Sequence, residues 1–155
     1  MRGDNLRKIL FRAKSIDKYK KNEWVEGYVF DDDYENGRLF VGGLEIQEYK
    51  GSACDDWDIV GSCFYEVDPS TLCQFTGLKD RNGDKIWEND IVRLADEDIY
   101  IVTWEEDDAM FALEDVCVVE NFGNVDSRWC EVIGNKFDNP ELIWKENKWV
   151  TVSKL

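Results

Sequence analysis

The segment 75–94 (FTGLKDRNGDKIWENDIVRL) constrains the fold of this chain more than any other part of the sequence. Asn82-Gly83 at its centre predicts a two-residue type I′ hairpin turn, because that turn needs a positive φ at both positions and Asn and Gly tolerate it best. Leu78 and Ile86 flank the turn as apolar partners. The segment therefore predicts a tight β-hairpin.

Polar breaks divide the next part of the chain into short strands. Residues 88–90 and 96–98 are such breaks, and the runs 91–94 and 99–104 beside them are rich in β-branched and aromatic residues, which is typical of strands. Short strands joined by tight turns predict an antiparallel meander, and we expect it to form a small barrel or a half-open sheet.

The same segment resembles the signature of the YopX family of bacteriophage and prophage proteins. The resemblance extends, in the same order along the chain, to ILFRA at 9–13, WV at 24–25, VIGN at 132–135 and NPEL at 139–142. It covers most of the chain. It implies an antiparallel β pseudo-barrel that is similar to PRC-barrel domains and carries a short helical cap, hence a mainly β (α+β) fold. It implies no activity.

Further apolar runs predict the remaining strands, with helices at two Asx-Pro pairs. We expect strands at 8–14, 24–30, 38–41, 44–49, 59–67, 109–113, 116–119 and 131–133. Gly42-Gly43 is expected to form a turn, and 50–58 a polar loop. Asp68-Pro69 and Asn139-Pro140 each predict a short helix, because an N-cap residue precedes a proline at the first helical position.

At 155 residues with 43% hydrophobic residues, the chain has the size and material of one domain. We therefore expect a single YopX-like domain over 1–155, in which 143–155 form an added hairpin or a tail. The sequence contains no apolar run of about 18 residues and no signal-peptide pattern. This favours a cytoplasmic location in a bacterial host cell.

The chain has five cysteines and no histidine. An odd number of cysteines without a C-x-x-C pair predicts buried small hydrophobic side chains rather than disulfides. The lack of histidine removes every Ser-His or Cys-His nucleophile arrangement and the usual zinc ligand sets. We therefore predict no catalytic residue, no cofactor-binding residue and no metal ligand; the cysteines are Cys54, Cys63, Cys73, Cys117 and Cys130.

Two groups of acidic residues partly resemble cation-binding sites. Asp80, Asn82 and Asp84 resemble the first positions of an EF-hand loop, but Gly83 comes one place early and Ile91 stands where the bidentate Glu belongs. A hairpin turn explains these residues. The run EEDD at 105–108 could hold a hard cation or supply a general acid and base, but such residues are also ordinary at exposed hairpin ends.

The seven tryptophans fall within or beside the strand-like runs, where aromatic residues are expected to pack in the core. A sugar-binding cleft lined by tryptophan is the alternative, and nothing in their spacing favours it. They are Trp24, Trp57, Trp87, Trp104, Trp129, Trp144 and Trp149.

The formal charge of −15 is concentrated in two acidic blocks, 31–68 at −9 and 96–120 at −10, while 1–30 carries +4. Phosphate repels such a chain, so direct nucleic-acid binding is not expected. We expect a non-enzymatic accessory protein of a phage or prophage that binds a host protein or self-assembles, as a homo-oligomer that covers its sheet edges. One alternative is an acidic, DNA-mimicking decoy of a host DNA-binding protein. A second is a carboxylate-based, metal-dependent hydrolase that uses Glu105, Glu106, Asp107 and Asp108.

Overall fold

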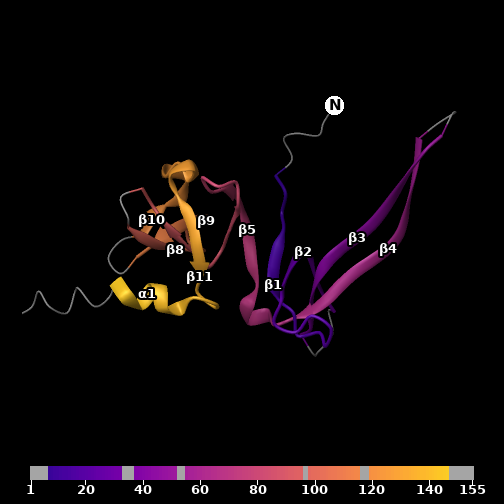
Figure 1. The fold of residues 1–155 in the computed structure, drawn as a ribbon, viewed down its shortest axis with the longest axis horizontal. Helices are drawn as coiled ribbons and strands as arrows, with labels where there is room; N and C mark the ends of the chain where they lie inside the picture. Colours follow the sequence, from indigo (N-terminus) through magenta and orange to yellow (C-terminus); the bar gives the residue numbers. More distant parts are fainter. Residues whose placement is uncertain (1–6, 33–36, 52–54, 96–97, 116–118, 147–155) are drawn as a thin grey trace, which may run out of the picture. The chain divides into compact units, whose positions relative to one another are not determined.

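The computed structural model describes residues 7–32, 37–51, 55–95, 98–115 and 119–146. These residues are mainly β, with two antiparallel sheets, three short 3-10 helices and one short α-helix (Figure 1). They fall into two compact units. The N-terminal unit is Ile9–Gln74, and the C-terminal unit is formed by the described residues from Phe75 onward with Arg7 and Lys8. The single domain over 1–155 stays a prediction.

The N-terminal unit is an antiparallel sheet in the strand order β4-β3-β2-β1-β5. The strands predicted at 8–14, 24–30 and 59–67 are confirmed within a few residues. The elements are β1 (Phe11–Lys14), β2 (Trp24–Asp31), β3 (Leu39–Lys50), β4 (Asp55–Val67), the 3-10 helix η1 (Pro69–Thr71) and β5 (Cys73–Lys79), which continues into the C-terminal unit.

The turn predicted at Gly42-Gly43 is wrong, because β3 runs through both glycines without a break. Gly42 pairs with Tyr28 of β2 on one side and with Phe64 of β4 on the other. A Cβ at Gly42 would lie 1.9 Å from the carbonyl oxygen of Cys63. The glycine therefore allows three strands to approach closely, and the strands expected at 38–41 and 44–49 are one strand.

β3 and β4 form one long hairpin (Figure 1). The loop predicted at 50–58 is wrong in extent, because β4 already begins at Asp55; residues 52–54 lie outside the described residues. The register shifts between Glu45 and Ile46, where β4 contains the extra residue Val60. Such a β-bulge increases the local twist of the hairpin.

Hydrogen bonds join the two sides of this sheet at its base. An isolated antiparallel bridge links Ser15 to Val67, and the N–H of Ile16 donates to the carbonyl of Glu66 at 2.9 Å. Four small or β-branched side chains from β1 to β4 form the core, namely Ala13, Val25, Val41 and Val67. One bridge does not close a barrel, and the strand orders of the described residues are open, so the pseudo-barrel and its PRC-barrel likeness stay predictions.

The predicted meander is confirmed in part: the C-terminal unit contains a sheet in the strand order β10-β9-β8-β7-β11, whereas β6 pairs with β5 in the first sheet. Its core is large and apolar, with Ile86, Val92, Val102, Leu113, Phe122 and Cys130 all buried. Residues 96–97 and 116–118, which belong to a predicted break and a predicted strand, lie outside the described residues. The elements are β6 (Lys85–Trp87), β7 (Asp90–Arg93), β8 (Ile99–Glu105), β9 (Met110–Glu114), β10 (Val119–Asn121), η2 (Phe122–Asn124), η3 (Ser127–Trp129), β11 (Glu131–Asn135) and α1 (Pro140–Glu146).

The hairpin at 75–94 is confirmed, but the type I′ turn is wrong. Of Asn82 and Gly83, only Gly83 has a positive φ, at +86°. The buried Asp80 organises the turn instead. Its Oδ1 accepts from the N–H groups of Asn82 at 2.8 Å and Asp84 at 2.9 Å, and its Oδ2 accepts from the N–H of Val132 in β11 at 3.0 Å.

Both predicted helix starts are confirmed. The Asp68 carboxylate accepts from the N–H of Ser70 at the start of η1, and α1 begins at Pro140. α1 extends to Glu146, and residues 147–155 lie outside the described residues, so the added hairpin or tail stays a prediction. Within the described part of the chain, no helix has the length and apolar character needed to cross a membrane.

Candidate interaction surface

The β3–β4 hairpin presents different side chains on its two faces. Directly opposed residues in an antiparallel pair point to the same side, and successive residues alternate. Val41 lies between Val29 and Tyr65, and this face packs in the core. Tyr28, Gly42 and Phe64 lie opposite one another on the other face. We call this second face the outer face.

The outer face carries a continuous row of apolar side chains over β2, β3 and β4. Half or more of most of these side chains is open to solvent, with exposed fractions between 48% and 62% for Tyr28, Phe30, Leu44, Ile46, Trp57 and Ile59. A solvated sheet face is normally polar. We call this set the apolar row: Tyr28, Phe30, Phe40, Leu44, Ile46, Trp57, Ile59 and Phe64.

Two hollows lie on the hairpin; members of the apolar row line the larger one, whereas Glu48, Lys50 and Asp56 also line the smaller one. A hollow of about 730 Å³ is lined almost entirely by members of the row, from Tyr28 to Ile46. The rings of Phe30 and Phe64 form its floor edge to face, with centroids 5.1 Å apart. A second hollow of about 420 Å³ continues toward the tip beside Trp57. Apolar hollows of this size, rimmed by polar groups, mark binding surfaces.

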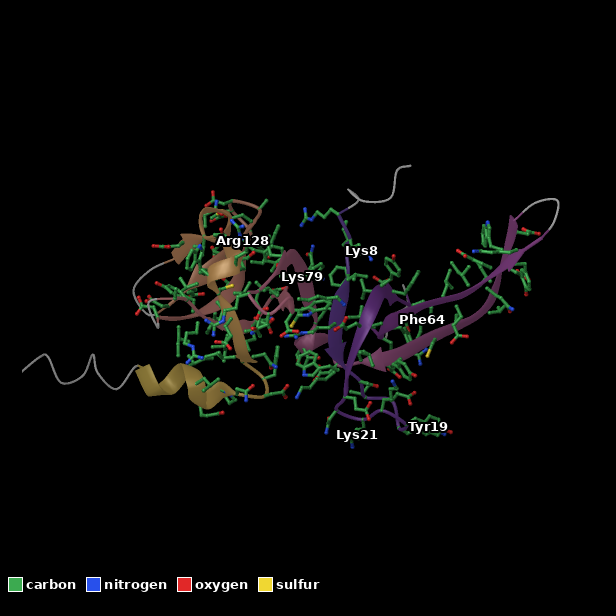
Figure 2. All side chains as sticks on the ribbon, turned by 45° about the horizontal axis from the view of Figure 1, so that its top comes forward. Lys8, Tyr19, Lys21, Phe64, Lys79 and Arg128 are labelled. Carbon is green, nitrogen blue, oxygen red and sulfur yellow. The ribbon has the colours of Figure 1, made fainter. Side chains whose placement is uncertain are left out.

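The outer part of the hairpin, residues 44–50 and 55–62, is here called the arm. Its charges are mostly acidic, with Glu45, Glu48, Asp55, Asp56 and Asp58 against Lys50. The turn between β1 and β2, at the opposite end of the N-terminal unit, carries Lys18, Lys20 and Lys21 (Figure 2). The arm is therefore acidic, whereas the turn at the base of the unit carries both signs, because Asp17 and Glu23 accompany the three lysines.

The C-terminal unit has a polar hollow of about 360 Å³, lined by Arg81, Arg93, Arg128 and Trp129 among others. The three arginine side chains of this hollow are already paired with carboxylates. Glu131 accepts from Arg93 at 3.0 Å and also from Arg81, and Asp126 accepts from Arg128 at 2.7 Å. The hollow is thus suited to hold an anion only in competition with these internal partners.

These ion pairs shift the titration of their members. The hydrogen bond from Arg93, followed by the charge of Arg81, lowers the pKa of Glu131. The hydrogen bond with Arg128 lowers the pKa of Asp126. Burial raises the pKa of the Cys130 thiol to about 11, so this thiol is a poor nucleophile near neutral pH.

Asp80 and the carboxylates at 105–108, which were the candidate cation ligands, lie in or beside turns. The Asp80 carboxylate accepts backbone hydrogen bonds within its own turn and from β11. Glu105 ends β8, and residues 106–108 lie in the exposed β8–β9 turn. Across the described ranges, no group of three or more His, Cys, Asp or Glu side chains is arranged to hold a metal ion.

The predictions for cysteine and tryptophan are confirmed in part. Cys73 and Cys130 are buried as expected, but Cys63, which lies in β4 directly next to the arm, is exposed. Trp87 is buried, whereas Trp57 and Trp129 are more than half exposed. Cys54, Cys117 and Trp149 lie outside the described residues.

Sequence reasoning missed the apolar row. Its signal is the alternation of Leu44 and Ile46 with the polar Glu45 and Gln47 along β3, which indicates one apolar face. The assumed turn at Gly42-Gly43 interrupted this pattern. The arginine hollow was also missed, since its arginines come from three separate segments.

Comparison with known proteins gives a family and a fold. The model of the family described as YopX protein matches residues 10–144. No curated protein matches the sequence. The crystal structure of protein EF1440 from Enterococcus faecalis is similar to this chain, with a TM-score of 0.50 and 24% sequence identity over 88% of this chain and 98% of that chain. At this identity the similarity concerns the fold.

Proposed function

This chain belongs to the YopX family, and we propose that it is a non-enzymatic accessory protein of a phage or prophage that acts by binding through the apolar row. The observation that carries the proposal is the exposure of Phe30, Leu44, Ile46 and Trp57 on one continuous face. Leaving so much apolar surface in water is unfavourable by about 25 cal/mol per Å². A partner that covers this face removes that cost.

Two further features support binding over catalysis. The carboxylates at 105–108 lie at an exposed turn, where water solvates them, and the Cys130 thiol is buried with a raised pKa. In the same proposal, the curled N-terminal sheet is the pseudo-barrel expected for the family, since the Ser15–Val67 bridge already joins its two sides.

The test compares two variants with the same charge change on opposite faces of β3. Ile46→Lys places a charge in the apolar row, whereas Gln47→Lys places it on the other face of the same exposed segment. Each tagged protein is incubated with bacterial extract containing an untagged copy of the chain, and captured proteins are eluted in salt steps. We expect Ile46→Lys to lose the captured partners and Gln47→Lys to keep them. Equal capture by both variants would overturn the proposal.

The same experiment tests the first alternative, and a separate thermal unfolding measurement tests the second. An acidic decoy would capture a basic host protein that leaves at moderate salt, and Ile46→Lys would not reduce that capture. A metal-dependent hydrolase would be stabilised thermally by millimolar calcium, magnesium or manganese, because a ligand that binds the native state raises its stability.

A further inference from the structure

We infer that the apolar row is covered by the same row of a second copy of this chain, with the two arms antiparallel. This inference rests on the proposed function and names its partner. A two-fold pair buries the same patch on both subunits, so the patch must complement itself. The following observations concern that requirement.

The arm needs a second layer. Its residues from Leu44 to Lys50 are all exposed, and an isolated two-stranded hairpin is marginally stable in water. A second hairpin packed on its apolar face at a spacing of about 10 Å would make a two-layer sandwich. The six half-exposed members of the row offer on the order of 600 Å² per copy, near the roughly 800 Å² per partner of a standard interface.

The distribution of charge favours antiparallel arms. Parallel arms would place the two acidic tips together, and like charges repel. Antiparallel arms place the acidic tip of one copy over the base of the other. The tip then approaches the end of the N-terminal unit, where Lys18, Lys20 and Lys21 lie in the same turn as Asp17 and Glu23.

The register of the arm locates the two-fold axis. On β3 the outer face runs from Phe40 to Glu48, so its midpoint is Leu44, which pairs with Ser62 of β4. An axis at this pair places Glu48 of one copy over Phe40 of the other. The Arg38 guanidinium lies 5.5 Å from the Phe40 ring centre and is paired with Asp32 at 3.0 Å, and Glu66 lies opposite Phe40 in β4. Glu48 of one copy therefore approaches a site of mixed charge on the other.

Sedimentation velocity tests whether the partner is a second copy. We expect a dimer for the unaltered chain and for Gln47→Lys, and a monomer for Ile46→Lys. A monomer for the unaltered chain at high concentration would overturn the inference. Loss of host-protein capture by Ile46→Lys would then still support the proposed function, so the two failures are distinguishable.

Cross-linking with a short bis-maleimide tests the orientation, in a chain whose Cys54, Cys63 and Cys117 are replaced by serine. Ser62→Cys lies beside the axis and is expected to cross-link two copies. Glu48→Cys is expected not to, because eight strand residues separate the two copies' positions by about 26 Å. Efficient cross-linking of Glu48→Cys would overturn the antiparallel arrangement.

The chain supplies its own control for this experiment. Cys63 is exposed and follows Ser62 directly, but it lies on the opposite face of β4. A chain that keeps Cys63 and replaces Cys54 and Cys117 is expected to remain a monomer on a denaturing gel after treatment. Cross-linking through Cys63 as efficient as through Ser62→Cys would show that contact between copies is not confined to the outer face, and would overturn the inference.

Discussion

The two units differ in whether they bury their large apolar side chains. In the C-terminal unit, Ile86, Leu113 and Phe122 are fully buried. In the N-terminal unit the core consists of alanine and valine, while Phe30, Ile46 and Trp57 are exposed. The C-terminal unit therefore contains its own hydrophobic stabilisation. The N-terminal unit instead leaves large apolar side chains exposed on its outer face.

The largest expected effect is the difference in stability between two isoleucine-to-alanine variants, one in each unit. Ile86→Ala should lower the free energy of unfolding by about 2–5 kcal/mol, because it leaves a cavity in a closed core. Ile46→Ala on the arm should change the stability of the monomer little. Urea denaturation of both variants, with hydrogen exchange to assign the change to a unit, measures the difference. Equal losses in dilute protein would contradict the comparison.

The second prediction concerns the polar centre of the C-terminal unit. Asp80→Ala should cost about 2–3 kcal/mol, because the N–H groups of Asn82, Asp84 and Val132 lose their acceptor. Asp80→Asn keeps one acceptor oxygen and should cost less. Urea denaturation measures both values. A loss of similar size for the two variants would show that charge, rather than hydrogen bonding, stabilises the turn.

The third prediction concerns the thin core of the N-terminal unit. Gly42→Ala should destabilise by roughly 1–3 kcal/mol or more, because its Cβ meets the backbone of Cys63. Gly43→Ala is the matched control, since a Cβ at Gly43 meets no atom within 4 Å. Thermal unfolding of both variants, followed by circular dichroism, checks the contrast. Tolerance of alanine at Gly42 would contradict the close approach of β2, β3 and β4.

The smallest expected effect is the pH dependence of Glu131. Its folded pKa is lowered by Arg93 and Arg81, so its contribution to stability is present above the pKa of an unfolded glutamate. That contribution is lost as the pH falls through the folded pKa. The stability difference between the unaltered chain and Glu131→Gln should therefore shrink from neutral to acidic pH.

Urea denaturation of both proteins across this range measures that difference. Raised salt at neutral pH should shrink it as well, because salt screens exposed charges. A difference that grows as the pH falls would contradict the assigned direction of the shift.

Local sequence signals determined several strands of the C-terminal unit and both helix starts. β-branched runs between polar breaks predicted β7 and β8, and the Asx-Pro pairs at 68–69 and 139–140 predicted η1 and α1. These signals suffice because strand breaks and helix caps depend on neighbouring residues. The ordered motifs also identified the family correctly.

Tertiary structure decided the roles that depend on distant segments. Gly42 could not be recognised as a close-approach residue, because the steric demand comes from β2 and β4. The acceptor role of Asp80 toward Val132 joins residues 52 positions apart. Alternation along β3 indicates that two faces differ, but it does not say which face the rest of the chain covers. For that reason the apolar row emerged only when the strands were placed side by side.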